Sequence, residues 1–255
     1  MIRRVPSWLG GLVGVAIVVA VWSILAVTYF RSSGAVPTPL AVLRQYGTDG
    51  FGFYWTNMSV TVRGAALGFA WGNLLALAVA VIVLLVPVLE GVATQLAVIS
   101  YCMPLTAVGP IILVVFGGRA PTVFLAGISV FFTTLIGALL GLKAADRTAL
   151  DVVAAYGGGR LAQLRKVRVI AALPATFSAL KIAAPAALLG AILGEYLGGV
   201  DNGLGVVITA AQQNYMVART WGLALACGLV AGAGYLIIGL LGRLLTPWAA
   251  KGAGR

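Results

Sequence analysis

Few side chains in this sequence could carry out chemistry. The 255 residues include 17 Lys and Arg, 6 Asp and Glu and no histidine, so the commonest general base and metal ligand is missing. Cys102 and Cys227 are isolated in apolar stretches, and their spacing fits neither a zinc site nor a disulfide framework. No phosphate-binding loop of the form GxxxxGK followed by Ser or Thr is formed by Lys143, Lys166, Lys181 or Lys251. We therefore predict a chain that is not an enzyme, does not hydrolyse ATP and binds no cofactor or metal of its own.

One carboxylate, Glu195, falls inside a long apolar segment at residues 178–197. An ionisable residue within a membrane segment is a candidate functional residue by default. Two interpretations remain open for Glu195. Its place near the end of the segment is explained by solvation at the membrane surface, and a proton relay would make the chain a proton-coupled secondary transporter. No second buried titratable residue is predicted to support a relay, so the secondary transporter stands as the alternative function.

The elements that hold these residues must lie in a membrane. Hydrophobic residues make up 61% of the chain and charged residues only 9%, against about 45–50% and about 25% in soluble domains. The length suits a single helical bundle, residues 1–255, rather than two domains. The net charge of +11 is spread between apolar runs and forms no basic face with interleaved aromatic residues, so nucleic-acid binding is not predicted.

Six apolar segments meet the length of roughly 20 residues that a helix needs to cross a membrane. The fold class predicted is therefore an all-α integral membrane protein with about six transmembrane helices. Pro104 and Pro110 fall inside the third segment, which we expect to be kinked, and residues 31–63 are expected to form an external connection with one short surface helix. The predicted spans are residues 9–29, 65–86, 92–116, 122–142, 178–197 and 223–245.

The distribution of basic residues predicts the orientation. If six spans start from the inside, 12 of the 17 Lys and Arg residues lie on the cytoplasmic side. Only five lie on the outer side, namely Arg31, Arg44, Arg63, Arg119 and Arg219. Both termini are therefore predicted to be cytoplasmic, in a multi-pass protein of the cell (inner or plasma) membrane. The connection near Glu90 carries no basic residue and does not add to this bias.

The longest polar stretch is the loop at residues 143–176, where two short helices are predicted around a glycine break. Thr148 and Asp151 have the spacing of a capping box, although Asp stands where Glu or Gln is usual. Three glycines from Gly157 end the first helix. The second helix places Leu161 and its apolar neighbours on one face and Arg160 with other polar residues on the opposite face. From these residues alone, an ordinary basic cytoplasmic loop explains the pattern as well as a docking element does.

This loop resembles the cytoplasmic loop of binding-protein-dependent ABC importer permeases, which has the pattern E-A-A-x3-G-x9-I-x-L-P. Asp151, Val152 and Val153 stand for E-A-A, Gly157 matches the glycine, and residues 167–170 stand for I-x-L-P. The departures are Asp for Glu, two valines for alanines and Ile170 for proline. A second register, on Ala154, Ala155 and Gly159, matches the alanines better but puts the later Leu-Pro pair two residues late.

Four further patches carry the same resemblance, and they match the branch of the family associated with sulfonate, taurine and nitrate. They are VPTPLAVL at residues 36–43, the P-x-x-A-x-x-P run ending in Phe-Gly at 104–117, GEYLGGVDNGLG at 194–205 and LTPW at 245–248. The resemblance implies a type I importer permease fold.

The resemblance also implies how such a chain works. It implies a dimer of ABC ATPase subunits that binds ATP and Mg, an external substrate-binding protein and a second permease, as in a homodimer or a pseudo-dimer of two related permeases. It implies a coupling helix that docks on the ATPase, to which we assign Asp151, Val153, Ala154, Gly157, Arg160 and Leu161. Polar residues that could line the translocation path are Ser100, Tyr101, Thr106, Ser129, Thr133 and Glu195, although such groups are equally typical of helix–helix hydrogen bonds.

Overall fold

The computed structural model describes residues 7–252, and the side chains of residues 9–249 within them. All regular structure in this range is helical, which confirms the predicted all-α class. The longer elements are α1 (Ser7–Val27), α2 (Pro39–Leu85), α3 (Glu90–Cys102), α4 (Leu105–Phe116), α5 (Ala120–Lys143), α8 (Val169–Tyr196) and α10 (Val217–Leu245). The shorter elements are η1 (Pro87–Leu89), α6 (Arg147–Ala155), α7 (Arg160–Gln163), the π-helical turn η2 (Leu164–Arg168), α9 (Leu204–Gln213) and α11 (Pro247–Gly252).

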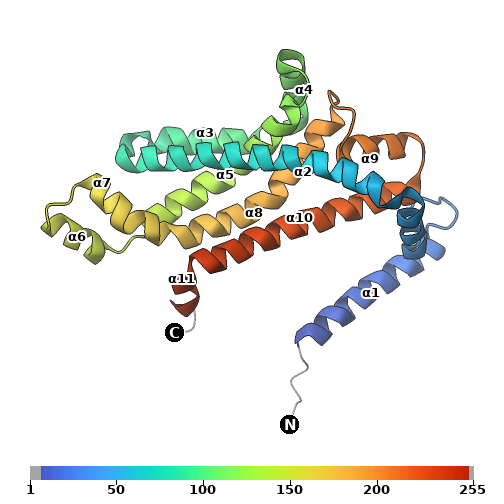
Figure 1. The fold of residues 1–255 in the computed structure, drawn as a ribbon, viewed down its shortest axis with the longest axis horizontal. Helices are drawn as coiled ribbons and strands as arrows, with labels where there is room; N and C mark the ends of the chain where they lie inside the picture. The colour runs from blue at the N-terminus through green and yellow to red at the C-terminus, as the bar shows by residue number, and fades with distance from the viewer. Residues whose placement is uncertain (1–6, 253–255) are drawn as a thin grey trace, which may run out of the picture.

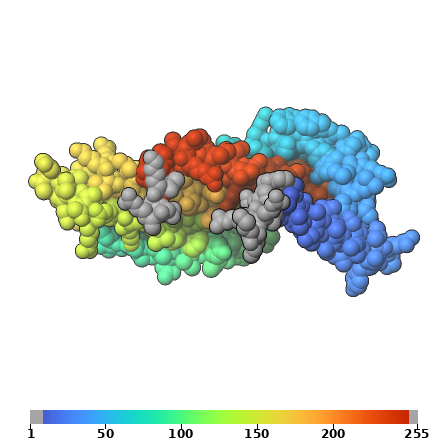
Figure 2. All heavy atoms as spheres, turned by 90° about the horizontal axis from the view of Figure 1, so that it is seen from below, coloured from blue at the N-terminus to red at the C-terminus, as the bar shows by residue number. Residues whose placement is uncertain are grey.

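The long helices run roughly along the long axis of the molecule (Figure 1). Five stretches of the described chain are long and apolar enough to cross a membrane: α1, α2, α5, α10 and the helix that runs from Arg160 to Tyr196. The bent segment from Pro87 to Phe116 makes a sixth if it is counted as one span. α6 and α7 lie at one end of the bundle and α9 lies at the other, and we refer to these as the α6 end and the α9 end. The space-filling view shows the yellow and yellow-green atoms of α6 and α7 at one end and the blue atoms of the first part of α2 at the opposite end (Figure 2).

Small residues let α5 pack closely between α2 and α8. On α2, a Cβ atom added at Gly72 would lie 2.3 Å from the carbonyl oxygen of Gly127. On α8, a Cβ atom at Gly190 would lie 2.5 Å from the carbonyl oxygen of Leu125. The buried Thr134 hydroxyl also donates to Asn73 Oδ1, which joins α5 to α2. Close backbone approach of this kind stabilises helix pairs in lipid, where the hydrophobic effect does not drive association.

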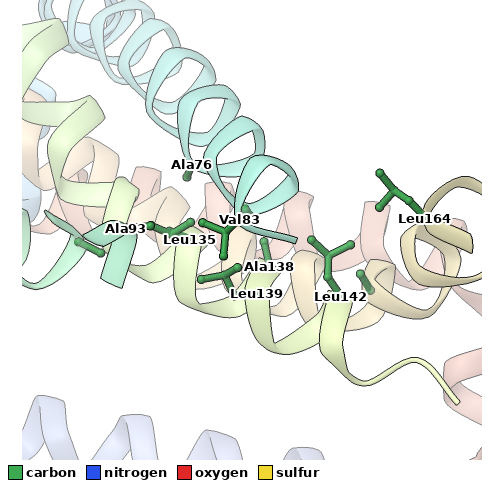
Figure 3. Close-up of a cluster of buried hydrophobic side chains, with 11 residues drawn as sticks. Ala76, Val83, Ala93, Leu135, Ala138, Leu139, Leu142 and Leu164 are labelled. Atoms are coloured by element: carbon green, nitrogen blue, oxygen red, sulfur yellow. The ribbon is translucent and has the colours of Figure 1, made fainter. Parts of the chain in front are cut away.

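At the α6 end, α2, α3, α5 and η2 enclose a buried apolar cluster (Figure 3). Val83 comes from α2, Ala93 from α3, Leu139 and Leu142 from α5, and Leu164 from η2. Leu164 is only 5% exposed, so burial of this side chain fixes η2 to the membrane bundle.

The beginning of α2 differs from the predicted connection at residues 31–63. Pro39 opens the helix, and Thr38 caps it by accepting a hydrogen bond from the amide of Ala41 at 3.2 Å. Gly50, with φ of +76°, interrupts the helix, which then continues without another break to Leu85. The expected short surface helix is therefore residues 39–49, but residues 51–64 are helical and continuous with the span that was predicted to start at 65.

The third segment bends sharply where the sequence predicts a kink. α3 ends at Cys102, and the axes of the preceding helical stretch and of α4 differ by 93°. Pro104 lies at the break, while Pro110 is accommodated inside α4. α4 therefore stands out from the bundle, and only Gly109 of this helix is buried.

The start of α8 also differs from the predicted boundary at residue 178. Helical structure continues from Arg160 through η2 into α8, so that Pro174 and Pro185 lie within the helix. The polar loop predicted over 143–176 is therefore shorter, and its last part belongs to the helix. Prolines are tolerated in membrane helices because neighbouring groups satisfy the freed carbonyls.

α1 lies apart from the other helices and contacts them through its last turns (Figure 1). The Trp22 indole donates to the carbonyl of Pro37 at 2.9 Å and stacks on Trp221, with ring centroids 5.6 Å apart. Most of the large apolar side chains of α1 are exposed, whereas Ala26 near its end is buried. The exposed faces suit contact with lipid or with another membrane helix.

Candidate functional site

The predicted docking element is a helix–turn–helix at the α6 end. α6 begins after Asp146, whose extended backbone occupies the N-cap position. The predicted capping box of Thr148 and Asp151 does not form, because both residues lie inside the helix. Leu150 is buried, whereas Asp151 is exposed. The face of α6 that carries Leu150 thus packs against the protein, and the face that carries Asp151 is exposed.

The turn after α6 is a Schellman motif. Gly157 adopts φ of +77°, the left-handed conformation that the break requires. Its amide donates to the carbonyl of Ala154 at 2.9 Å, and the Gly158 amide donates to the carbonyl of Val153 at 2.8 Å. These two bonds satisfy the last carbonyls of α6 and fix the angle at which the chain leaves the helix. Tyr156, at the turn, is 90% exposed.

Side chains after the turn join α7 to α6 and tie this element to the ends of two other helices. The Gln163 amide donates to the carbonyl of Leu150 at 3.2 Å, joining α7 to α6. Arg160 donates to the carbonyl of Leu85, the last residue of α2, at 3.4 Å. Arg168 donates to the carbonyl of Leu142 near the end of α5 at 3.3 Å. Cations at helix C-termini stabilise the unsatisfied carbonyls there.

An ion pair adds a further link at the same end. Lys143, the last residue of α5, pairs with Glu90, the first residue of α3, and both side chains are 45% exposed. The connection that carries Glu90 therefore lies beside the basic loop, and the Lys143 side chain reaches it.

Glu195 lies near the α9 end and is 2% exposed, so the interpretation that it is solvated at the membrane surface is wrong. Its Oε2 atom accepts from the Thr61 hydroxyl at 2.9 Å and from the amide of Gly205 at 2.8 Å. The Leu204 amide donates to Thr61 Oγ1 at 2.8 Å, and the Gly203 amide donates to Asn57 Oδ1 at 3.1 Å. Glu195, together with Thr61 and Asn57 of α2, thus binds the amides at the start of α9.

This arrangement has the electrostatics of a helix cap supplied from elsewhere in the chain. The first amides of a helix lack partners within it and carry partial positive charge, which a carboxylate stabilises. Two glycines make room for the contact. A Cβ atom at Gly203 would lie 2.4 Å from Glu195 Cδ, and one at Gly205 would lie 2.7 Å from Glu195 Cβ. Glu195 Oε1 has no hydrogen-bond partner among the described residues.

A second set of polar contacts at this end joins the first part of α2 to the start of α10. Asp49, whose side chain is 0% exposed, forms an ion pair with Arg219. The same carboxylate accepts from Gln45 Nε2 at 2.7 Å and from the Tyr54 hydroxyl at 3.1 Å. The Tyr46 hydroxyl donates to the carbonyl of Gly222 at 2.5 Å.

Sequence reasoning missed both groups at this end. Asn57 and Thr61 lie in a stretch expected to be an external connection, and only a helical pattern through residues 51–64 could have placed them opposite Glu195. Asp49 and Arg219 are 170 positions apart, and no local pattern links them.

The candidate path residues do not converge on one cavity. Ser100 and Ser129 donate to carbonyls of their own helices, those of Ala97 and Leu125, both at 2.7 Å. Tyr101 is exposed and packs against Phe132, with ring centroids 4.7 Å apart. Thr106 is exposed on α4, and Thr133 is half-buried on α5. None of them lines the two hollows beside α10 described below, and their role in a path remains a prediction.

No group of three or more His, Cys, Asp or Glu side chains that could hold a metal ion occurs in the described part of the chain. The structure instead has two features that the helix from Arg160 to Tyr196 connects. One is the helix–turn–helix at the α6 end, and the other is the buried polar cluster that holds α9 at the opposite end.

Several known proteins are similar to this chain in sequence. Residues 72–251 match the family described as "Binding-protein-dependent transport system inner membrane component". The chain is 29% identical over 204 residues to a probable ABC transporter permease protein of Haemophilus influenzae, covering 80% of this chain and 82% of the relative. It is 23% identical to the putative aliphatic sulfonates transport permease protein SsuC of Bacillus subtilis, over 96% of this chain and 90% of that protein. The formylaminopyrimidine transport permease protein ThiX of Halalkalibacterium halodurans is 24% identical, over 85% and 86%.

Proposed function

Because this chain belongs to the binding-protein-dependent transport system inner membrane components, a family of multi-pass ABC transporter permeases, we propose that it forms the translocation path of an ATP-driven importer. A soluble binding protein delivers a small solute to the α9 end, and a separate pair of ATPase subunits, which bind ATP and Mg, docks at the α6 end. The chain itself carries no cofactor and performs no hydrolysis.

The helix–turn–helix at the α6 end is the observation that carries this proposal. α6 is held by buried Leu150, exposes Asp151 and ends in a rigid glycine turn. The chain then runs without interruption from Arg160 into a membrane-crossing helix. A push from the ATPase pair on α6 and α7 therefore acts directly on the bundle, as expected for gating by a two-state element. The Gly157 register of the coupling motif is supported, because Gly157 has the positive φ and Gly159 does not.

The second copy required for a complete path would contact exposed apolar faces. α1 and the protruding α4 leave large apolar side chains uncovered, among them Val114 and Phe116. Faces of this kind support a homodimer, in which the candidate path residues of α3, α4 and α5 would lie between the copies. The solute is a small molecule, and the relatives differ in what their names state: aliphatic sulfonates in one case, a formylaminopyrimidine in another.

Reconstitution tests the proposal. The purified chain alone should show no ATPase activity above background, because it has no nucleotide-binding loop. Activity should appear in proteoliposomes only with the ATPase subunits of the same transporter, and the solute-loaded binding protein should raise that activity further. ATP hydrolysis by the lone chain, or solute uptake driven by a proton gradient without ATP, would refute the importer in favour of another class of transporter.

The orientation follows from the excess of Lys and Arg at the α6 end, and we propose that this end is cytoplasmic together with both termini. Single cysteines placed at Arg160 and at Asn202, both exposed, should report it in a version lacking Cys102 and Cys227. In intact cells an impermeant thiol reagent should label the cysteine at 202 and leave that at 160 unlabelled until the membrane is permeabilised. Labelling of both positions from outside would contradict the six-span topology.

A further inference from the structure

A basic crevice of about 280 Å³ opens between α8 and α10 towards the α6 end, and transport does not account for it. Its walls include Phe177 and Lys181 on α8 and Gly242 and Arg243 on α10, with Ala249 of α11 beside them. Gly242 lets the helices approach, since a Cβ atom there would lie 3.1 Å from Phe177 Cβ. The crevice therefore presents two cations between two closely packed membrane helices.

Neither cation is neutralised by a carboxylate in the described part of the chain. The two ion pairs found there are Lys143–Glu90 and Arg219–Asp49. Lys181 lies about three turns into α8, and its Nζ atom is 4.2 Å from the centre of the Tyr235 ring. A membrane-embedded cation is costly without a counter-charge, and an aromatic ring supplies only part of one. The crevice thus favours an anionic ligand.

The hydroxyls in the crevice donate to their own helices, Ser178 to the carbonyl of Pro174 and Thr246 to that of Gly242. Donors for an anion must therefore come from Lys181 and Arg243. Two cationic donors in reach of one small crevice suit a phosphate group, whose oxygens only accept.

The depth and shape of the site indicate an amphiphilic ligand. Arg243 lies in the last turn of α10, and Trp248 on α11 is 48% exposed, the position that indole rings favour at a membrane surface. A groove of about 580 Å³ between α2, α8 and α10 shares Ile238 with the crevice. The walls of this groove are apolar apart from Ser59 and Arg63 towards the α9 end. The basic crevice at the membrane surface thus continues into an apolar groove along the helices.

We propose that this crevice and groove bind an anionic phospholipid of the leaflet at the α6 end. The phosphodiester lies between Lys181 and Arg243, and an acyl chain follows the groove past Ile238. This inference requires only that the chain is embedded in a membrane, so it stands or falls independently of transport. Basic pockets between membrane helices recognise lipid headgroups by the same chemistry.

Native mass spectrometry of the detergent-purified protein, titrated with phosphatidylglycerol or phosphatidylcholine, tests the site. We expect phosphatidylglycerol to bind more tightly than phosphatidylcholine. Lys181→Met and Arg243→Gln should each weaken phosphatidylglycerol binding about fivefold, as expected for loss of one basic contact. Arg44→Gln, which removes an exposed cation at the α9 end, is the matched control and should leave binding unchanged. Melting temperatures measured without lipid identify any variant that is misfolded.

Equal binding of the two lipids, or full phosphatidylglycerol affinity in the Lys181→Met and Arg243→Gln double variant, would overturn the proposal. Displacement of bound phosphatidylglycerol by millimolar inorganic phosphate would also overturn it, because the site would then take a soluble anion. A photo-reactive residue at Ile238 provides an independent measurement in membranes. A lipid adduct supports the assignment, whereas a chain-to-chain product would place a second copy in the groove and refute it.

Discussion

Replacing Gly157 with valine is expected to abolish ATP-driven transport while leaving membrane insertion intact. The residue has φ of +77°, and nothing lies within 4 Å of an added Cβ atom, so the effect comes from backbone conformation alone. A left-handed conformation costs an ordinary residue about 1–2 kcal/mol, and β-branching adds to this. Valine would therefore relax the turn and break the hydrogen bonds that the amides of residues 157 and 158 donate to the carbonyls of Ala154 and Val153. The direction of α6 relative to α7 would change as a result.

The measurement compares solute uptake and binding-protein-stimulated ATPase activity in proteoliposomes. Gly159→Val is a closely matched control, because Gly159 has φ of −75° in extended backbone and also has nothing within 4 Å of an added Cβ. It should retain most of the activity. Asp151→Asn should be mild, because Asp151 is exposed and lies beyond the first turn of α6, where the helix dipole has little effect. Wild-type transport by Gly157→Val would mean that the loop is only a basic connector.

Glu195→Ala is expected to destabilise the α9 end strongly. Removing the carboxylate leaves the buried Gly205 amide without its acceptor, a loss that costs about 1–3 kcal/mol, and leaves the Thr61 hydroxyl only the carbonyl of Asn57, at 3.2 Å, to donate to. Glu195→Gln should be much milder, because its amide oxygen can accept both bonds from the position of Oε2. The expected result is a lower melting temperature for the alanine variant and a near-normal one for the glutamine variant.

The same pair of variants separates the importer from the proton-coupled transporter. If Glu195 holds α9 in place, Glu195→Gln should keep most of its ATP-driven uptake. If it relays protons, glutamine should abolish uptake as completely as alanine does. Asp201→Ala removes an exposed carboxylate from the connection between α8 and α9 and serves as the control, with no change expected in either measurement.

Long apolar segments were the most predictable part of the fold. α5 occupies 120–143 where the sequence predicts 122–142. The boundaries were predictable because a continuous apolar run of membrane-spanning length lies between the basic residues Arg119 and Lys143. The glycine break at Gly157 was also readable, since a run of three glycines after an amphipathic stretch is a local signal.

Tertiary contacts account for what the sequence could not show. Residues 51–64 contain polar side chains typical of a connection, yet Asn57 and Thr61 face the start of α9 from inside a helix. The environment of Glu195 depends on partners more than 130 positions away as well as on nearby Gly205. Pro174 reads locally as a helix boundary, but the bundle accommodates it within α8.

The helix from Arg160 to Tyr196 continues through the π-helical turn η2 and past Pro174 and Pro185, so it connects the two ends of the protein. Its 37 residues span about 55 Å, so a tilt of about 5° at one end would displace the other by about 5 Å. At one end of the helix Arg160 donates a hydrogen bond to the end of α2, and at the other end Glu195 accepts one from the start of α9. Because η2 and the two prolines lie within this helix, bending at those positions would decide how faithfully motion at one membrane face is reproduced at the other.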